Sequence, residues 1–187
     1  YNNQNGFMAQ AYVNFLTEER LGGQKEVDWN MQPSVNNPFG VNIKNDRIDA
    51  FLKSGYTFKN GKSAIAWLSN FSRHETESYY GLTPYNADET RFYANAVLTH
   101  DLDAYARHIL NAGASFVYDD FNEAIYDQNI ERTEKVPGLF AEYTFKPNPN
   151  LTLMAGLRTD FHNLFGTFVT PRMHFRYHFA DHFTIRT

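Results

Sequence analysis

The chain has 187 residues, a net charge of −4 and a mean hydropathy of −0.55, so it fits one or two ordinary domains and gives no electrostatic argument for nucleic-acid binding. Cysteine is absent, which excludes a disulfide framework and a thiolate metal site. No run of apolar residues approaches the roughly 20 that a membrane helix needs, although aromatic residues make up 17% of the chain, more than an ordinary enzyme carries.

Apolar and polar residues alternate with a period of two along most of the chain, and few segments show helical periodicity. Successive side chains of a β-strand point to opposite faces, so this alternation predicts strands with one apolar and one polar face. About nine strands are expected, in chain order over residues 6–20, 45–58, 63–74, 90–100, 107–120, 139–145, 151–160, 170–179 and 182–187.

The connections between these strands alternate between short and long. Tight turns rich in Asn, Gly, Asp or Pro are expected at 58–62, 100–104, 146–150 and 179–182. Long polar loops are expected at 18–42, 75–89 and 119–136, with a shorter one at 161–168. All tight turns then fall at one end of the sheet and all long loops at the other, which is typical of an antiparallel outer-membrane barrel.

The strand at 170–179, TPRMHFRYHF, shows the two faces most clearly. Basic side chains occupy one parity and Met173, Phe175, Tyr177 and Phe179 the other. By itself this strand fits either a soluble sheet with a buried aromatic face or a barrel strand whose aromatic face contacts lipid. The one-sided loops and an uncharged band of about 25 Å on the apolar face favour the barrel. A soluble lectin-like β-sandwich and an outer-membrane barrel enzyme remain as alternatives.

Residues 136–187 contain a specific order of features. A Gly-x-Phe-x-Glu-Tyr strand is followed by a Pro/Asn turn, a strand ending Ala-Gly-Leu-Arg-x-Asp, a short loop and Thr-Pro-Arg. This order closely resembles the barrel of TonB-dependent outer-membrane receptors, particularly the Bacteroidetes type. The residues that carry the resemblance are Gly138, Phe140, Glu142, Tyr143, Ala155, Gly156, Leu157, Arg158, Asp160, Gly166, Pro171 and Arg172.

The resemblance implies an all-β, up-and-down antiparallel meander of about nine long strands, forming an open section of a large transmembrane barrel. Residues 1–187 would be a partial barrel domain from the middle of a 22-stranded barrel. The plug domain, its coupling box and the remaining strands would lie outside this chain. The implied location is the outer membrane of a Gram-negative bacterium, and the implied activity is uptake of a large scarce solute such as a siderophore, haem, cobalamin or glycan.

The implied partners are the outer-membrane lipid, the receptor's own plug domain, the TonB energy-coupling complex and an extracellular solute, with no nucleic acid. Charged side chains facing lipid would cost about 2–4 kcal/mol per Arg at the bilayer midplane, so charged strand residues are expected to face the lumen and the plug. This set comprises Arg47, Asp49, Arg91, Glu142, Arg158, Asp160, Arg172, His174, Arg176 and His178.

Aromatic and histidine residues near the expected long loops are candidates for contact with the solute. These outer candidates are Trp29, His74, Tyr79, Tyr80 and Tyr85. His174 and His178 lie about 13 Å apart on a strand, too far to share a metal ion. No metal site, cofactor or catalytic set is expected, because the chain has none of the nucleophile-elbow, phosphate-loop or zinc-helix motifs.

Overall fold

The computed structural model describes residues 6–180 and 183–187, and within them the chain forms one antiparallel sheet. Each strand pairs with its sequence neighbours in the order β1 to β9, which confirms the predicted meander of about nine strands. The strands are β1 (Phe7–Gly23), β2 (Gly40–Thr57), β3 (Ser63–Tyr80), β4 (Thr83–Asp101), β5 (His108–Ile125), β6 (Gln128–Asn148), β7 (Leu151–His162), β8 (Gly166–Ala180) and β9 (Phe183–Arg186).

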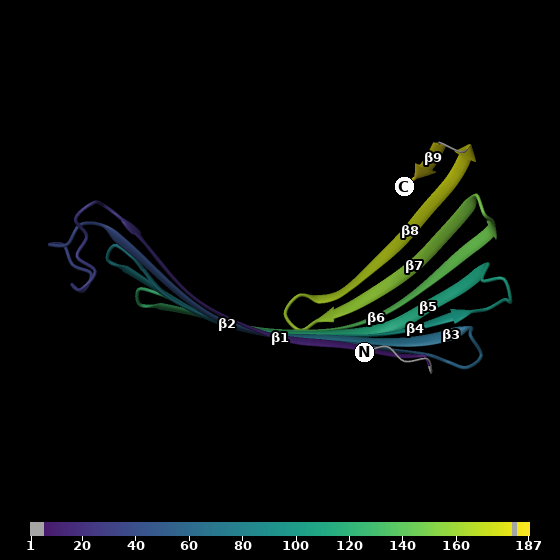
Figure 1. Ribbon diagram of the computed structural model, residues 1–187, viewed down its shortest axis with the longest axis horizontal. Helices are drawn as coiled ribbons and strands as arrows, with labels where there is room; N and C mark the ends of the chain where they lie inside the picture. The colour runs from purple at the N-terminus through teal and green to yellow at the C-terminus, as the bar shows by residue number, and fades with distance from the viewer. Residues whose placement is uncertain (1–5, 181–182) are drawn as a thin grey trace.

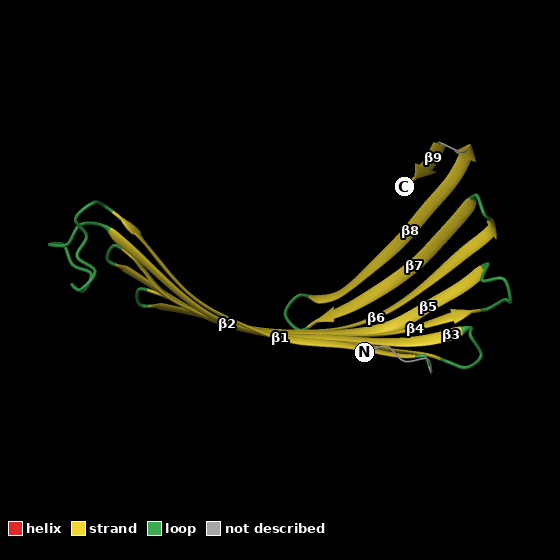
Figure 2. Cartoon of the chain, viewed as in Figure 1, coloured by secondary structure: helices red, strands yellow, loops and turns green. Residues whose placement is uncertain are grey.

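The sheet is bent into an open trough, and its two edges, β1 and β9, lie apart (Figure 1). Only strands and loops are drawn for the described part of the chain (Figure 2). No second layer covers either face of this sheet, and Ala94 is the one apolar residue of the described ranges that is buried. The soluble sandwich alternative is therefore wrong, because a sandwich needs two sheets that bury their inner faces against each other.

The pairing between the long strands is regular. β3 and β4 pair without interruption from Ser63 opposite His100 to Tyr80 opposite Thr83, and β1 pairs with β2 in the same way. The ladder shifts between Phe145 and Asn148, where β6 reaches its turn. Because the side-chain period is two, this regular register keeps every residue of one parity on one face across many strands.

The predicted long loops at 75–89 and 119–136 are wrong. Both segments are strand, and two-residue turns at 81–82 and 126–127 join β3 to β4 and β5 to β6. Gly81 has a φ of +63° at the first central position, where a type II′ hairpin turn requires a positive value. The polar side chains in these segments give them the composition of a loop, but the backbone of each segment is hydrogen-bonded to the adjacent strand. Of the loops predicted at this end, 24–39 is the long one, inside the predicted range 18–42.

The turns at the opposite end agree with the prediction more closely. Connections at 58–62, 102–107 and 149–150 are short. Side chains accept backbone N–H groups there: Asn60 accepts from Lys62 at 3.0 Å, and Asn148 accepts from Asn150 at 3.0 Å. The turn predicted at 179–182 includes residues 181–182, which lie outside the described residues. Side-chain bonds such as those of Asn60 and Asn148 are the reason that Asn and Asp mark tight turns.

β1 to β6 run on past the apolar part of the convex face. Along β3 this face carries, in order, Ile65, Trp67, Ser69, Phe71, Arg73 and Glu75. Arg73 forms ion pairs with Glu75 and, at 3.1 Å, with Asp88 of β4. The strands therefore leave the apolar layer and continue as a polar extension that ends in the 81–82 and 126–127 turns.

No helix within the described residues is long and apolar enough to span a membrane.

Candidate functional site

All ten residues predicted to face the lumen lie on the same side of the sheet. The register shows this directly: Asp49 is opposite Ser72, Ser72 is opposite Arg91, and Arg91 is opposite Asp119. Farther along the sheet, Glu142 is opposite Gly156 and Gly156 is opposite Arg172. The structure thus places the predicted charged set on one shared surface. Contact between that surface and a plug domain stays a prediction.

The opposite face is apolar and bare. Phe15 is 73% exposed, Leu157 53% and Met173 80%, and all three point to this side. Phe175 and Tyr177 lie there as well, with their rings 6.5 Å apart. Outside the polar extension, large apolar side chains left open to this extent across many strands need an apolar partner, and lipid is the partner that covers such a face in a membrane barrel.

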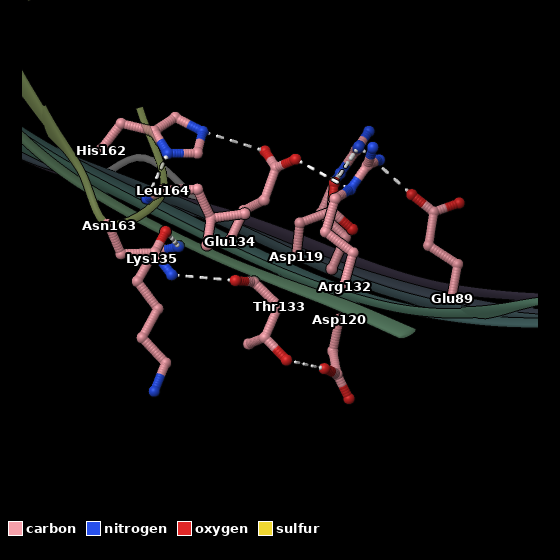
Figure 3. A network of polar contacts seen from close by, with 11 residues as sticks. Glu89, Asp119, Asp120, Arg132, Thr133, Glu134, Lys135, His162, Asn163 and Leu164 are labelled. Carbon is pink, nitrogen blue, oxygen red and sulfur yellow. Dashed lines mark hydrogen bonds and ion pairs between the residues drawn. The ribbon is translucent and has the colours of Figure 1, made fainter. Parts of the chain in front are cut away.

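A network of charged side chains crosses β4, β5, β6 and β7 on the inner side of the curve. In Figure 3, Glu89, Arg132, Glu134 and His162 stand on one side of the strands, toward which the ribbon curves. Arg132 pairs with Glu134 at 2.9 Å, and His162 Nε2 lies 3.3 Å from Glu134 Oε2. On this part of the concave face, Glu134 therefore both pairs with Arg132 of its own strand and contacts the imidazole of His162 on β7.

Arg91 joins this network from β4. Its guanidinium pairs with Asp119 of β5 and lies 3.2 Å from Glu89 of its own strand. The second carboxylate oxygen of Asp119, Oδ1, is buried without a hydrogen-bond partner in the described structure. Asp119, Glu134 and His162 were not among the predicted site residues, because they fall in or beside segments that composition had assigned to loops. Continuing the strand parity of β5, β6 and β7 through those segments would have found them.

Hydrogen bonds fix the Arg158 side chain to its own strand and to β5. Its Nε donates to Asp160 Oδ2 at 2.7 Å and its Nη2 to Asp160 Oδ1 at 2.6 Å, a two-pronged pairing that fixes the guanidinium plane. A further bond of 2.8 Å runs from Nη2 to Ser115 Oγ on β5, two strands away. Gly138 lies directly opposite Asp160 and leaves the space that this pair occupies.

The basic residues of β8 have different partners. Arg172 Nε donates to His174 Nε2 at 2.9 Å, and Arg176 donates to Thr152 Oγ1 at 3.2 Å. His178 Nδ1 lies 2.8 Å from Thr184 Oγ1. Within residues 6–180 and 183–187, neither Arg172 nor Arg176 has a carboxylate at ion-pair distance, so β8 presents net positive charge on the concave face.

A hollow of about 550 Å³ lies on the concave face between β6 and β8. It is bounded by Phe140, Glu142, Gly156, Arg158 and Arg172, with Asn95 of β4 beside them. The Glu142 carboxylate and the Arg172 guanidinium stand on either side of Gly156 and do not pair with each other. Among the described residues, no group of three or more His, Cys, Asp or Glu side chains is placed to hold a metal ion.

The outer candidates are placed differently from the prediction. His74 and Tyr80 lie on the concave side of β3, Tyr79 on its convex side, and Tyr85 on the concave side of β4, so all four are strand residues rather than loop residues. Trp29 does lie in the 24–39 loop. Tyr85 donates its hydroxyl to Glu123 Oε1 at 2.6 Å, and this bond raises the pKa of Tyr85 to about 12. Contact of any of these five with a solute stays a prediction.

Comparison with known proteins identifies the family. Residues 1–187 match the family described as TonB dependent receptor-like, beta-barrel. The chain belongs to this family. No curated protein sequence matches the chain. TonB-dependent receptors are proteins of the Gram-negative outer membrane, and this chain is located there. The narrower Bacteroidetes type stays a prediction.

One solved structure has the same fold. It is the siderophore receptor PirA from Pseudomonas aeruginosa, with a TM-score of 0.64 and 14% sequence identity. The match covers 97% of this chain and 32% of that receptor, so the chain spans about a third of the receptor's length. At this identity the likeness shows the fold alone. It agrees with an open section of a large barrel, as the resemblance implied.

Proposed function

We propose that this chain forms part of the wall of an energy-coupled outer-membrane transporter that takes up a large scarce solute. The coarser assignment, outer-membrane transport by a TonB-dependent receptor barrel, follows from the family. In the full protein, a plug domain would fill the space inside the trough, and the TonB complex would act on that plug. The solute would bind above the membrane, where β1 to β6 continue past the apolar face.

The observation that carries the proposal is the opposite chemistry of the two faces. The concave face carries charged side chains, among them the pairs of Arg158 with Asp160 and Arg91 with Asp119, whereas the convex face exposes Leu157 and Met173. A soluble protein would bury the apolar face and expose the charged one. Lipid outside and a polar lumen inside is the arrangement in which both faces of this sheet are stabilised.

The length of the outer polar surface supports a solute larger than a simple ion. The polar extension of β1 to β6 gives the outer end a surface far longer than a small ion needs (Figure 1). An iron chelate is the first solute class to test, since the structurally similar protein is a siderophore receptor. Haem, cobalamin and glycans follow. The chain is expected to have no enzymatic role.

The test is solute uptake by cells that carry the full-length receptor, compared with cells from which its gene has been deleted. The proposal expects uptake of one of these solutes to disappear on deletion and on collapse of the proton gradient. Tyr80→Ala at the outer end should weaken uptake. Tyr105 lies in the 102–107 turn at the other end and is 79% exposed, and Tyr105→Ala should leave uptake unchanged. Uptake that persists at full rate without the proton gradient would contradict energy coupling.

A further inference from the structure

The β7–β8 turn, residues 163–165, is tied to β6 by the side chain and the backbone of Asn163 (Figure 3). Asn163 N donates to Lys135 O at 3.2 Å, and Lys135 N donates to Asn163 Oδ1 at 2.8 Å. Asn163 Nδ2 donates to Thr133 O at 2.9 Å. These bonds join backbone amides to a carboxamide, and neither kind of group titrates near neutral pH. The attachment of the turn to β6 is therefore the same in mildly acidic and in neutral water.

His162 holds the other part of the turn. Leu164 N donates to His162 Nδ1 at 3.1 Å. A backbone N–H is always a donor, so Nδ1 accepts this bond and carries no proton. In the neutral ring the proton then lies on Nε2, which is 3.3 Å from Glu134 Oε2. The Phe165 ring packs against the imidazole, with 4.7 Å between the two ring centroids. The direction and the tautomer of the imidazole are thus fixed by its neighbours.

Two other turns of the chain are closed by a bond of the same kind, with an amide oxygen as the acceptor. Asn60 Oδ1 accepts from Lys62 N at 3.0 Å, two residues along the chain. Asn148 Oδ1 accepts from Asn150 N at 3.0 Å in the same way. At position 162 an imidazole nitrogen takes the place of that oxygen. An imidazole nitrogen can gain a proton between pH 5 and pH 8, whereas an amide oxygen cannot.

The charges around His162 favour a protonated ring at one of its two nitrogens. On β8 the residue opposite His162 is Gly166, which brings no charge, and the side of the ring toward β6 faces the Glu134 carboxylate. Protonation of the ring turns the contact with Glu134 into an ion pair. The charged side chains that face this part of the concave side are Arg132 and Glu134 on β6, Asp119 on β5, Glu89 and Arg91 on β4, and Arg158 and Asp160 on β7 itself.

We propose that His162 is a proton-dependent latch of the β7–β8 turn. Protonation at Nδ1 sets two donors against each other, the new ring N–H and the Leu164 N–H, so the bond that closes the turn is lost. The charged ring stays on β6, because its Nε2–H now makes a charge-assisted bond to Glu134. Leu164 and Phe165 then move away from the ring, while Asn163 keeps the turn attached to β6. The turn is closed at pH 8 and open at pH 5.

The test is hydrogen–deuterium exchange of the Leu164 amide in the full-length receptor in lipid nanodiscs. The protection factor is the intrinsic exchange rate divided by the observed rate, so it removes the direct effect of pH on exchange chemistry. It should fall about two- to tenfold between pH 8 and pH 5, the range that the loss of one hydrogen bond gives. The Lys62 amide, whose acceptor is Asn60, is the internal control, and its protection factor should stay constant.

Three variants separate the latch from a general effect of pH on the barrel. His162→Asn should make the protection of Leu164 independent of pH, because the Asn oxygen accepts the same N–H and does not titrate. His162→Phe should give low protection at both pH values, since its ring offers no acceptor. Glu134→Gln should move the fall in protection to lower pH, because it removes the negative charge that stabilises the protonated imidazole.

The comparison of Leu164 with Lys62 in the wild-type receptor needs no substitution, so it decides the question even if a variant fails to assemble. A constant protection factor at Leu164 would overturn the proposal, and so would an equal fall at Lys62, which indicates loosening of the whole sheet. A fall that persists in His162→Asn would assign the effect to another group and would also overturn it. The experiment contains no solute, so a negative result leaves the transport proposal intact.

Discussion

Gly138 of β6 and Asp160 of β7 lie directly opposite each other, and a Cβ at Gly138 would overlap Asp160 Oδ1. The same Cβ would come within 2.8 Å of Ser115 Oγ and 2.9 Å of Arg158 Nη2. The missing side chain of Gly138 therefore leaves the space for the hydrogen-bonded cluster of Ser115, Arg158 and Asp160, which joins β5 to β7. A flexible side chain could move aside at many positions, but here Asp160 and Ser115 are both held by hydrogen bonds from the Arg158 guanidinium.

The first prediction concerns the space at Gly138. Gly138→Ala should destabilise the full-length receptor by about 1–3 kcal/mol, because the added methyl group forces apart a packed and bonded cluster. The measurement is the free energy of unfolding in lipid vesicles. Gly22→Ala in β1 is the matched control: nothing lies within 4 Å of the place that its added methyl group would take, so stability should change little. Equal losses in the two variants would contradict the prediction.

The second prediction tests which face contacts lipid. Leu157 and Met154 lie on the same strand, β7, on the convex and concave faces respectively. Leu157→Arg should lower the free energy of unfolding in a bilayer by about 2–4 kcal/mol, as expected for Arg facing lipid at the midplane. Met154→Arg should cost much less, since it faces the polar side. A larger loss for Met154→Arg would reverse the assignment of the two faces.

The third prediction concerns the ion pair between Arg91 and Asp119. The Asp119 side chain is 14% exposed and that of Arg91 52%, so solvent screens the pair only in part. A double-mutant cycle with Arg91→Gln and Asp119→Asn should give a coupling free energy of about 0.5–1.5 kcal/mol. The comparison pair is Arg20 with Glu18, whose side chains are 67% and 28% exposed. Its coupling should be smaller, and a larger value there would show that burial does not control these pairs.

The fourth prediction is a pH dependence at the outer end. The hydrogen bond from Tyr85 to Glu123 raises the pKa of Tyr85 to about 12, above its ordinary value of 10.0. A raised pKa means that the protonated phenol is favoured in the folded state. Its contribution to stability is fully present below pH 10 and is lost as the pH rises through 12.

NMR of ¹³C-labelled tyrosine can measure this shift, with Tyr85→Phe used to assign the signal. Glu123→Gln should lower the pKa of Tyr85 toward its ordinary value, since it removes the negative charge and weakens the hydrogen bond. An unchanged titration midpoint in that variant would show that Glu123 is not the cause.

The segments 75–89 and 119–136 show where composition misleads. Their Asn, Asp, Glu and Tyr residues fit a loop, yet both segments pair with strand neighbours, as in Glu77 opposite Asn86. Outside the lipid layer both faces of a strand can be polar, so the alternation that marks a strand disappears while its backbone ladder continues. Hairpins of this length are specified by pairing with the partner strand, and local composition does not carry that signal.

What the sequence determined by itself is the alternation of side chains, and hence the two-faced strands, their order along the chain and the assignment of Arg47, Arg158 and Arg172 to the polar faces of their own strands. These are local properties, because a period of two follows from the geometry of one extended chain. Only the tertiary structure decided how far each strand continues and which residues meet across the sheet. Register and pairing depend on backbone hydrogen bonds between distant segments, so the contact of Arg158 with Ser115, 43 residues away, is set by the assembled sheet.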